Sequence, residues 1–169
     1  YYDIIYPDGG EKRIYRPLAM RTYRFIQFDI ETKAEALKLD DFYGVFTAYP
    51  FEKTTTFDCD NQDLVQINNV AWKTLQNSST DNFIDPYYEQ LQYIGDSRIE
   101  ALVSIFNTND DALMRNAIKQ FDDSRLNLGL TCSRYPSYIV QIIPTYSLLW
   151  IGMLNDYYMY RDDPAFVKQ

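Results

Sequence analysis

The stretch from Asp58 to Ser79 reads DCDNQDLVQINNVAWKTLQNSS, and the chain changes character there. Four of its apolar residues recur at the spacing of one helix face: Leu64, Ile67, Ala71 and Leu75. Asp60 is suited to cap this helix, and Asp63 puts a negative charge in the first turn, where the helix dipole favours it. We therefore expect a helix that begins after Asp60 and ends at the polar run Asn77-Ser78-Ser79.

Three more stretches downstream repeat the helical spacing of apolar residues, over residues 99–106, 113–121 and 146–157. Asn109 and Asp110 precede the second stretch as candidate caps, and Pro144 opens the third. Asp162-Asp163-Pro164 has the pattern of one further helix start. Successive helices joined by loops predict stacked αα-hairpins.

The residues before Asp58 have the composition of β-strands. The longest strand-like run, Arg21 to Ile30, reads RTYRFIQFDI, and a change of phase after Phe25 suggests a bulge. Similar runs cover residues 14–16, 37–45 and 54–57. Because no helix separates these runs, we expect the strands to pair antiparallel. The predicted fold class is therefore α+β, with antiparallel strands followed by αα-hairpins.

The composition excludes several classes of function. The chain has 169 residues and a formal net charge of -8, and an acidic chain repels the phosphates of nucleic acid. No apolar run reaches the roughly 18 to 20 residues of a membrane helix, so no membrane span is expected. Histidine is absent, which removes His-based nucleophiles and His-based zinc sites. Cys59 and Cys132 have no metal-ligand spacing and are expected to be free thiols, so we expect neither a metal nor another cofactor.

The N-terminus and the aromatic content add two expectations. Tyr1-Tyr2-Asp3-Ile4-Ile5 lacks the basic start and apolar region of a signal peptide, and it reads like the inside of a longer protein. The 16 Tyr, 10 Phe and 2 Trp could stack on sugar rings, but we expect most of them to fill the core.

Acidic and aromatic residues gather from Asn82 to Arg98, which reads NFIDPYYEQLQYIGDSR. Glycoside hydrolysis needs one carboxyl that keeps its proton, which apolar surroundings promote, and another that binds sugar or activates water. Asp85, Glu89 and Asp96 are the candidates. A helix through this stretch would put Glu89 and Asp96 on one face, but Gly95 predicts that part of it is loop. By spacing alone, acidic residues before a helix are more often caps and solvated side chains than catalytic groups.

The run from Asp85 to Arg98 resembles the signature of the bacterial α-L-rhamnosidases, glycoside hydrolase family 78. That signature is Asp-Cys-Pro, a short spacer, Glu, and a Gly-Asp pair whose Asp follows the Glu by seven positions. Glu89, Gly95 and Asp96 fall on the last three of these places, and Leu91 also matches. The resemblance implies that Glu89 is the general acid and that Asp96 helps to bind the sugar. It also implies hydrolysis of terminal α-L-rhamnosides with inversion, by a general base that lies outside this chain.

Two departures from the signature affect the expected site. Aligned without a gap, Asp85 stands at the position of the family Cys, so either a one-residue deletion gives Asp85 the role of the family Asp or that sugar contact is lost. Tyr88 and Tyr93 replace the family's Arg and Trp, as in a branch that uses Tyr-Tyr-Glu-Gln-Leu-Gln-Tyr. We expect Asp85, Tyr93 and Arg98 to contact the substrate.

A second place for substrate contacts is the loop Arg134-Tyr135-Pro136-Ser137-Tyr138, because binding residues concentrate on loops. Tyr135 is the candidate that we assign to the site. Tyr138 and Trp150 could also stack on sugar, although the helical spacing of Trp150 with Met153 and Leu154 favours the core.

The resemblance also implies an architecture. Residues 1–58 would be the last strands of a β-sandwich, and residues 59–169 the first hairpins of an incomplete (α/α)6 barrel. The partners would be a rhamnose-containing glycan or glycoside and the rest of a longer bacterial enzyme, with a periplasmic or extracellular location expected for that enzyme. The chain alone is expected to be inactive. A non-catalytic carbohydrate-binding relative, and an α/α-barrel glycosidase for another sugar, remain as alternatives.

Overall fold

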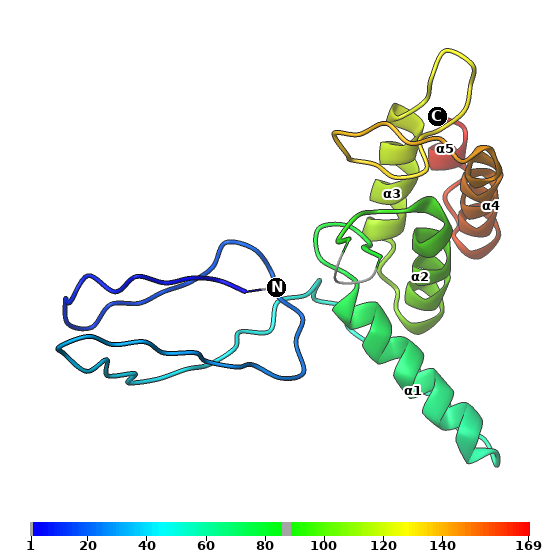
Figure 1. The fold of residues 1–169 in the computed structure, drawn as a ribbon. Helices are drawn as coiled ribbons and strands as arrows, with labels where there is room; N and C mark the ends of the chain where they lie inside the picture. The colour runs from blue at the N-terminus through cyan, green and yellow to red at the C-terminus, as the bar shows by residue number, and fades with distance from the viewer. Residues whose placement is uncertain (1, 86–88) are drawn as a thin grey trace. The chain divides into compact units, whose positions relative to one another are not determined.

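The computed structural model describes residues 2–85 and 89–169, and Figure 1 shows its elements in chain order. The chain divides into two units, Tyr1–Lys38 and Leu39–Gln169. All helices of the described residues lie in the second unit: α1 (Gln62–Asn77), α2 (Ile94–Asn107), α3 (Ala112–Asp123), α4 (Pro144–Tyr160) and α5 (Pro164–Val167). The predicted helices are therefore confirmed, including the short one after Asp162-Asp163.

The N-terminal part corrects the predicted fold class. No β-strand forms in the described residues of 1–58, and Figure 1 draws this part as coil that runs out and back. The side chains that predicted strands stay exposed, with Phe25 86% and Ile14 84% accessible. A sandwich strand depends on ladder partners and on a second sheet that covers its apolar face, and the described residues supply neither. What the structure contains is a helical hairpin domain preceded by extended coil.

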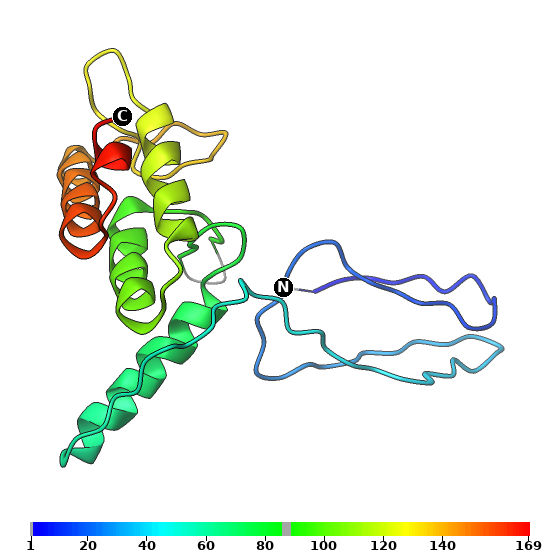
Figure 2. The ribbon, with the colours of Figure 1, turned by 180° about the vertical axis from the view of Figure 1, so that it is seen from behind.

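The last part of this coil packs on the helices. The backbone N–H of Tyr49 donates to Ser79 O at 2.7 Å, and its hydroxyl donates to Asp110 Oδ2 at 2.7 Å. The ring of Phe51 lies 6.2 Å from the ring of Trp72 on α1. Figure 2 shows the extended segment running beside α1. These contacts explain why the second unit begins before the first helix.

The N-terminus of α1 differs by one residue from the prediction. Asn61, not Asp60, is the N-cap, because its Oδ1 accepts the backbone N–H of Asp63 at 3.0 Å. An amide oxygen satisfies a free N–H of the first turn as well as a carboxylate does. Ser78 is the C-cap, and its hydroxyl donates to Thr74 O at 2.6 Å. The predicted end of the helix is thus confirmed.

Helix α2 is the centre of the hairpin domain, since it packs against α1, α3 and α4. Ala101 is fully buried at the middle of α2, where a small side chain lets its neighbours approach. The surrounding core comes mainly from the apolar faces of α3 and α4: Leu113, Met114, Ala117, Ile118, Phe121, Met153 and Tyr157. Trp150 packs against this core, as its helical spacing predicted, and its Nε1 donates to Ile118 O at 3.0 Å.

An ion pair joins α2 to α4. Arg98 donates from Nε to Asp156 Oδ2 at 2.7 Å and from Nη2 to Asp156 Oδ1 at 3.3 Å. Gly152 makes room for the guanidinium, because a Cβ at that position would stand 2.6 Å from Arg98 Nη1. The paired fork geometry makes this one of the stronger polar contacts between the helices.

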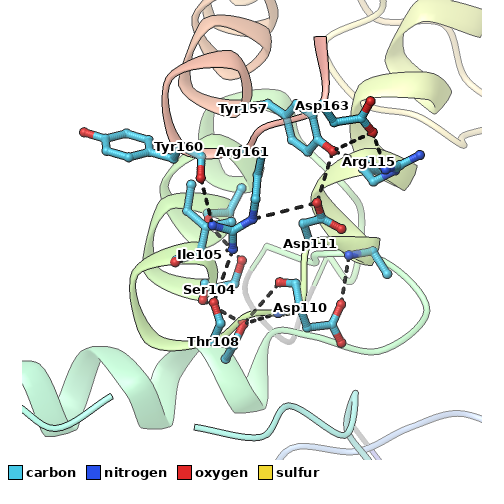
Figure 3. A network of polar contacts seen from close by, with 12 residues as sticks. Ser104, Ile105, Thr108, Asp110, Asp111, Arg115, Tyr157, Tyr160, Arg161 and Asp163 are labelled. Carbon is cyan, nitrogen blue, oxygen red and sulfur yellow. Dashed lines mark hydrogen bonds and ion pairs between the residues drawn. The ribbon is translucent and has the colours of Figure 1, made fainter. Parts of the chain in front are cut away.

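A polar network ties the ends of α2 and α4 to the starts of α3 and α5 (Figure 3). The Tyr157 hydroxyl donates to Asp111 Oδ2 at 3.1 Å and accepts from Arg115 Nη1 at 3.2 Å. Arg115 also donates to Asp163 Oδ2 at 2.8 Å. Burial raises the pKa of Tyr157 to about 12, so the hydroxyl keeps its proton at neutral pH. This network lies at the C-terminal end of α2. The candidate site carboxyls lie near the N-terminal end of the same helix.

Among the described residues, no helix has both the length and the apolar character required to cross a membrane.

Candidate functional site

The candidate site is built on the loop that leads into α2. The two ends of this loop are joined, because Asp85 N donates to Leu91 O at 2.9 Å and Leu91 N donates to Asp85 Oδ1 at 3.0 Å. Residues 86–88, which include the signature Pro86 and Tyr88, lie outside the described residues. Gln90 has φ 53, in the left-handed region that allows a sharp turn. The loop thus brings Glu89 back toward Asp85.

A buried glutamine pins this loop to the rest of the domain. Gln92 is only 2% exposed, and its Nε2 donates to Gln120 Oε1 on α3 at 2.6 Å and to Tyr135 O at 2.8 Å. Tyr135 N donates back to Gln92 O at 3.0 Å. The loop before α2 is therefore fixed to the loop after α3 by main-chain and side-chain contacts.

Tyr93 and Arg134 meet where these two loops touch. Their backbones form an isolated antiparallel bridge. Arg134 Nη1 donates to the Tyr93 hydroxyl at 2.9 Å, and the guanidinium carbon lies 5.7 Å from the centre of the Tyr93 ring. The Glu89 carboxylate also acts to raise the pKa of Tyr93. Burial raises the pKa of Tyr93, while Arg134 acts in the opposite direction.

Asp85 is the buried member of the acidic group, with 8% of its surface exposed. Burial raises its pKa to about 6, and the neighbouring carboxylates of Glu89 and Asp96 act in the same direction, while the N–H of Leu91 opposes them. Glu89 itself is exposed.

Asp96 and Glu100 extend the acidic group along α2. Asp96 is exposed in the first turn, where the helix dipole favours a negative charge. Glu100 lies one turn later on the same face. Burial raises the pKa of Glu100 to about 8, and the charges of Asp96 and Asp85 add to that effect, while the nearby Ser78 opposes it. Its Oε2 is buried and has no hydrogen-bond partner in the described part of the chain.

The structure brings together four of the six predicted site residues: Asp85, Glu89, Tyr93 and Asp96. Arg98 lies two residues beyond Asp96, on the opposite side of α2, where it pairs with Asp156. The side chain of Tyr135 packs against the core. Tyr138 is 96% exposed at the tip of its loop. The roles assigned to these residues stay predictions.

Sequence reasoning missed two residues of this group. Arg134 opens the loop that was singled out for Tyr135, but only the bridge between two loops shows that it reaches Tyr93. The signal for Glu100 was its spacing of four from Asp96, which places two carboxyls on one helix face.

The arrangement suits proton transfer to a ligand better than metal binding. Searching the described residues for groups of His, Cys, Asp and Glu that could hold a metal ion finds none. The group instead combines a buried carboxyl whose pKa is raised to about 6, an exposed carboxyl near it, and donors from a tyrosine and an arginine. These are the groups that glycoside hydrolysis uses.

Comparisons with known proteins agree with this chemistry. Residues 52–169 match the family described as the bacterial α-L-rhamnosidase six-hairpin glycosidase domain. A family 78 rhamnosidase from Bacillus sp. GL1 is similar in structure, with a TM-score of 0.66 and 27% identity over 70% of this chain and 13% of that chain. A rhamnosidase from Klebsiella oxytoca, solved with rhamnose bound, has a TM-score of 0.55 and 26% identity over 72% of this chain and 24% of that chain. The chain thus spans less than a quarter of either relative. A comparison with curated protein sequences gave no match.

Proposed function

We propose, since this chain belongs to the family of bacterial α-L-rhamnosidase six-hairpin glycosidase domains, that it is part of an enzyme that hydrolyses terminal α-L-rhamnosides with inversion. The observation that supports this proposal is the group of carboxyls at the start of α2, in which Glu89 and Asp96 both act on the buried Asp85. The rhamnose bound to the Klebsiella oxytoca relative favours a rhamnoside as the substrate.

In the proposed mechanism, Glu89 donates a proton to the departing glycosidic oxygen. Glu89 is exposed and so can be reached by a substrate, while Asp85 beside it is buried. Asp96 accepts hydrogen bonds from sugar hydroxyls. Inversion needs a second carboxylate that activates water from the opposite face of the sugar.

We assign that general base to a part of the enzyme outside these 169 residues, as the family resemblance implies. Residues 59–169 would then supply the first hairpins of the catalytic barrel. On this view the purified 169-residue chain does not hydrolyse rhamnosides. Turnover by this chain at the rate of the full-length enzyme would overturn the assignment of the base.

The test of the general acid is Glu89→Gln in the full-length enzyme. A rhamnose-terminated disaccharide has a poor leaving group and needs proton donation, which is worth about 10²- to 10⁴-fold in rate. We expect a loss of that order in kcat/KM for the disaccharide and a smaller loss for an aryl rhamnoside, whose leaving group needs less assistance.

Asp81→Asn is the matched control, because Asp81 precedes the loop and contributes to none of the contacts around Asp85. Equal rates for wild type and Glu89→Gln would remove Glu89 from the mechanism. Rhamnoside binding without hydrolysis by the wild-type enzyme would support a carbohydrate-binding role instead, and hydrolysis of another glycoside in its place would move the proposal to that sugar.

A further inference from the structure

Two carboxamide side chains of α3 reach the loop that carries the site. Asn116 and Gln120 are four residues apart, so they share a face of α3. Asn116 Nδ2 donates to Asp81 O at 3.3 Å and to Asn82 Oδ1 at 3.0 Å, where the loop begins. Gln120 Oε1 accepts from Gln92 Nε2 at 2.6 Å, where the loop ends. One helix face therefore contacts both ends of the loop.

The partners of Gln92 fix the orientation of both glutamine amides. The backbone oxygen of Tyr135 can only accept, so the group that Gln92 presents to it at 2.8 Å is its NH2. The second hydrogen of that NH2 is left for Gln120, whose facing atom must then be the carbonyl oxygen. Gln120 therefore acts as a hydrogen-bond acceptor, a role that a glutamate at this position keeps and a leucine loses.

The backbone connects Gln92 to Asp85. Leu91 directly precedes Gln92, and its N–H donates to Asp85 Oδ1 at 3.0 Å. The carbonyl of Leu91 accepts from Asp85 N at 2.9 Å, so these two residues are joined in both directions. The Asp85 carboxyl is thus held by a backbone donor, and the place of that donor depends on the side chain of the next residue.

We propose that Gln120 is a positioning residue for the loop that carries Asp85 and Glu89, and that it acts through Gln92. The effect on the reaction rests on the proposed function. Gln92 is 2% exposed, and its Oε1 is buried without a hydrogen-bond partner among the residues that the structure describes. A buried acceptor without a partner lowers stability, so stability alone does not account for an amide here. Placement of the loop does, because a displacement of about 1 Å can slow catalysis a hundredfold.

The first measurement concerns the loop itself, in the 169-residue chain. Gln120→Leu removes the acceptor, so we expect hydrogen exchange at the Leu91 N–H to become roughly tenfold faster, while amides in the middle of α4 keep their rates. Gln120→Glu keeps an acceptor and should restore most of the protection. Gln66→Leu is the matched control, because it is the same substitution at an exposed glutamine of α1. Unchanged exchange at Leu91 in Gln120→Leu would overturn the inference.

The second measurement concerns turnover by the full-length enzyme. Displacing the loop moves the proposed acid Glu89, so Gln120→Leu should lose roughly tenfold in kcat/KM for the rhamnose-terminated disaccharide. The aryl rhamnoside should lose less, a difference that a smaller amount of folded enzyme would not produce. Gln120→Glu should recover most of the rate. If Gln120 acts through Gln92, adding Gln120→Leu to Gln92→Leu causes no further loss.

The outcomes separate this inference from the proposed function. If Glu89→Gln shows the leaving-group dependence and Gln120→Leu does not, Gln120 has no positioning role and Glu89 remains the acid. Additive losses in the double variant would overturn the route through Gln92. If Glu89→Gln shows no leaving-group dependence, the proposed function itself fails, and the exchange rate of the Leu91 N–H still decides whether Gln120 holds the loop.

Discussion

At the scale of single residues, the carboxyls at the start of α2 differ in what surrounds them. Asp85 and Glu100 are shielded from water, and burial raises the pKa of the first to about 6 and of the second to about 8. Asp96 and Glu89 are exposed. A cluster of four acids can therefore hold protons on its buried members while its exposed members face a ligand.

The Asp85 proton predicts a pH dependence of the proposed reaction. A raised pKa means that the carboxyl is protonated below about pH 6 and loses its proton above it. Because Asp85 lies beside the proposed acid Glu89, we expect kcat/KM for the disaccharide to fall above about pH 6, as Asp85 loses its proton. In Asp85→Asn the amide donates permanently, and the fall should move away from pH 6. An identical pH profile in both proteins would show that Asp85 does not control the proton.

Glu100 predicts a pH dependence of stability. Its folded-state pKa of about 8 lies above the ordinary value of 4.5, so between these values the unfolded state gives up a proton that the folded state keeps. Its contribution to the free energy of unfolding is full below about pH 4.5 and is lost as the pH rises to about 8. The wild type should lose up to about 1.4 kcal/mol per pH unit across this window, and Glu100→Gln should be flatter.

Urea unfolding of the 169-residue chain across that pH range measures this difference. Glu52→Gln is the control, because Glu52 is exposed and its neutralisation should leave the pH dependence as it is in the wild type. Parallel pH dependences in wild type and Glu100→Gln would mean that Glu100 is not held protonated in the fold.

At the scale of the elements, α2 has two faces with different tasks. One face carries Asp96 and Glu100 toward the acidic group, and the other carries Arg98 toward α4. The sequence predicted sugar binding for Arg98, but the structure places it in an ion pair with Asp156. The side chain of Arg98 is 32% exposed and that of Asp156 is 13% exposed. The contact joins two helices that are adjacent in space and separated in sequence by α3.

The prediction at this scale is that Arg98→Met affects stability. Removing the cation leaves a largely buried carboxylate without its partner, which should cost about 1–3 kcal/mol in the free energy of unfolding. Arg125→Met breaks an exposed ion pair with Asp122 and should cost less than about 1 kcal/mol. In Arg98→Met/Asp156→Asn the loss should be smaller than the sum of the single losses. A change confined to KM for rhamnosides would instead favour the sugar-binding role.

At the scale of the whole molecule, the two units differ in how they are stabilised. Every residue of the buried core belongs to the second unit, from Leu75 to Phe166. Two aromatic residues before α1, Tyr49 and Phe51, pack against that core. Many apolar side chains of residues 2–38 are exposed. Burial of apolar surface is the main source of stability, so the helical unit should fold without the first unit.

Truncation tests this division. A chain of residues 39–169 should unfold at nearly the temperature of the full 169-residue chain, because no core residue is removed. A chain of residues 58–169 is the contrast, since it loses Tyr49 and Phe51 and should be less stable by about 2 kcal/mol or more. Equal unfolding temperatures for the two truncated chains would mean that the extended segment contributes nothing.

The sequence by itself determined the helices and the acidic run that leads into α2. Helical periodicity is a local signal, because residues three and four apart share a face whatever lies around them. Local signals were weaker at the boundaries, where Asn61 took the capping role expected of Asp60. They failed for residues 1–58, because strands depend on partners and on a covering face that local sequence does not supply.

The tertiary structure alone decided which charged groups meet. Arg134 reaches Tyr93 across 41 positions in the sequence, and Arg98 reaches Asp156 across 58. The raised pKa values of Asp85 and Glu100 have a related origin, since they come first from burial in the folded chain. Sequence spacing places a carboxyl on a helix face, but the dielectric and the partners that set its charge come from the packing of other elements against that face.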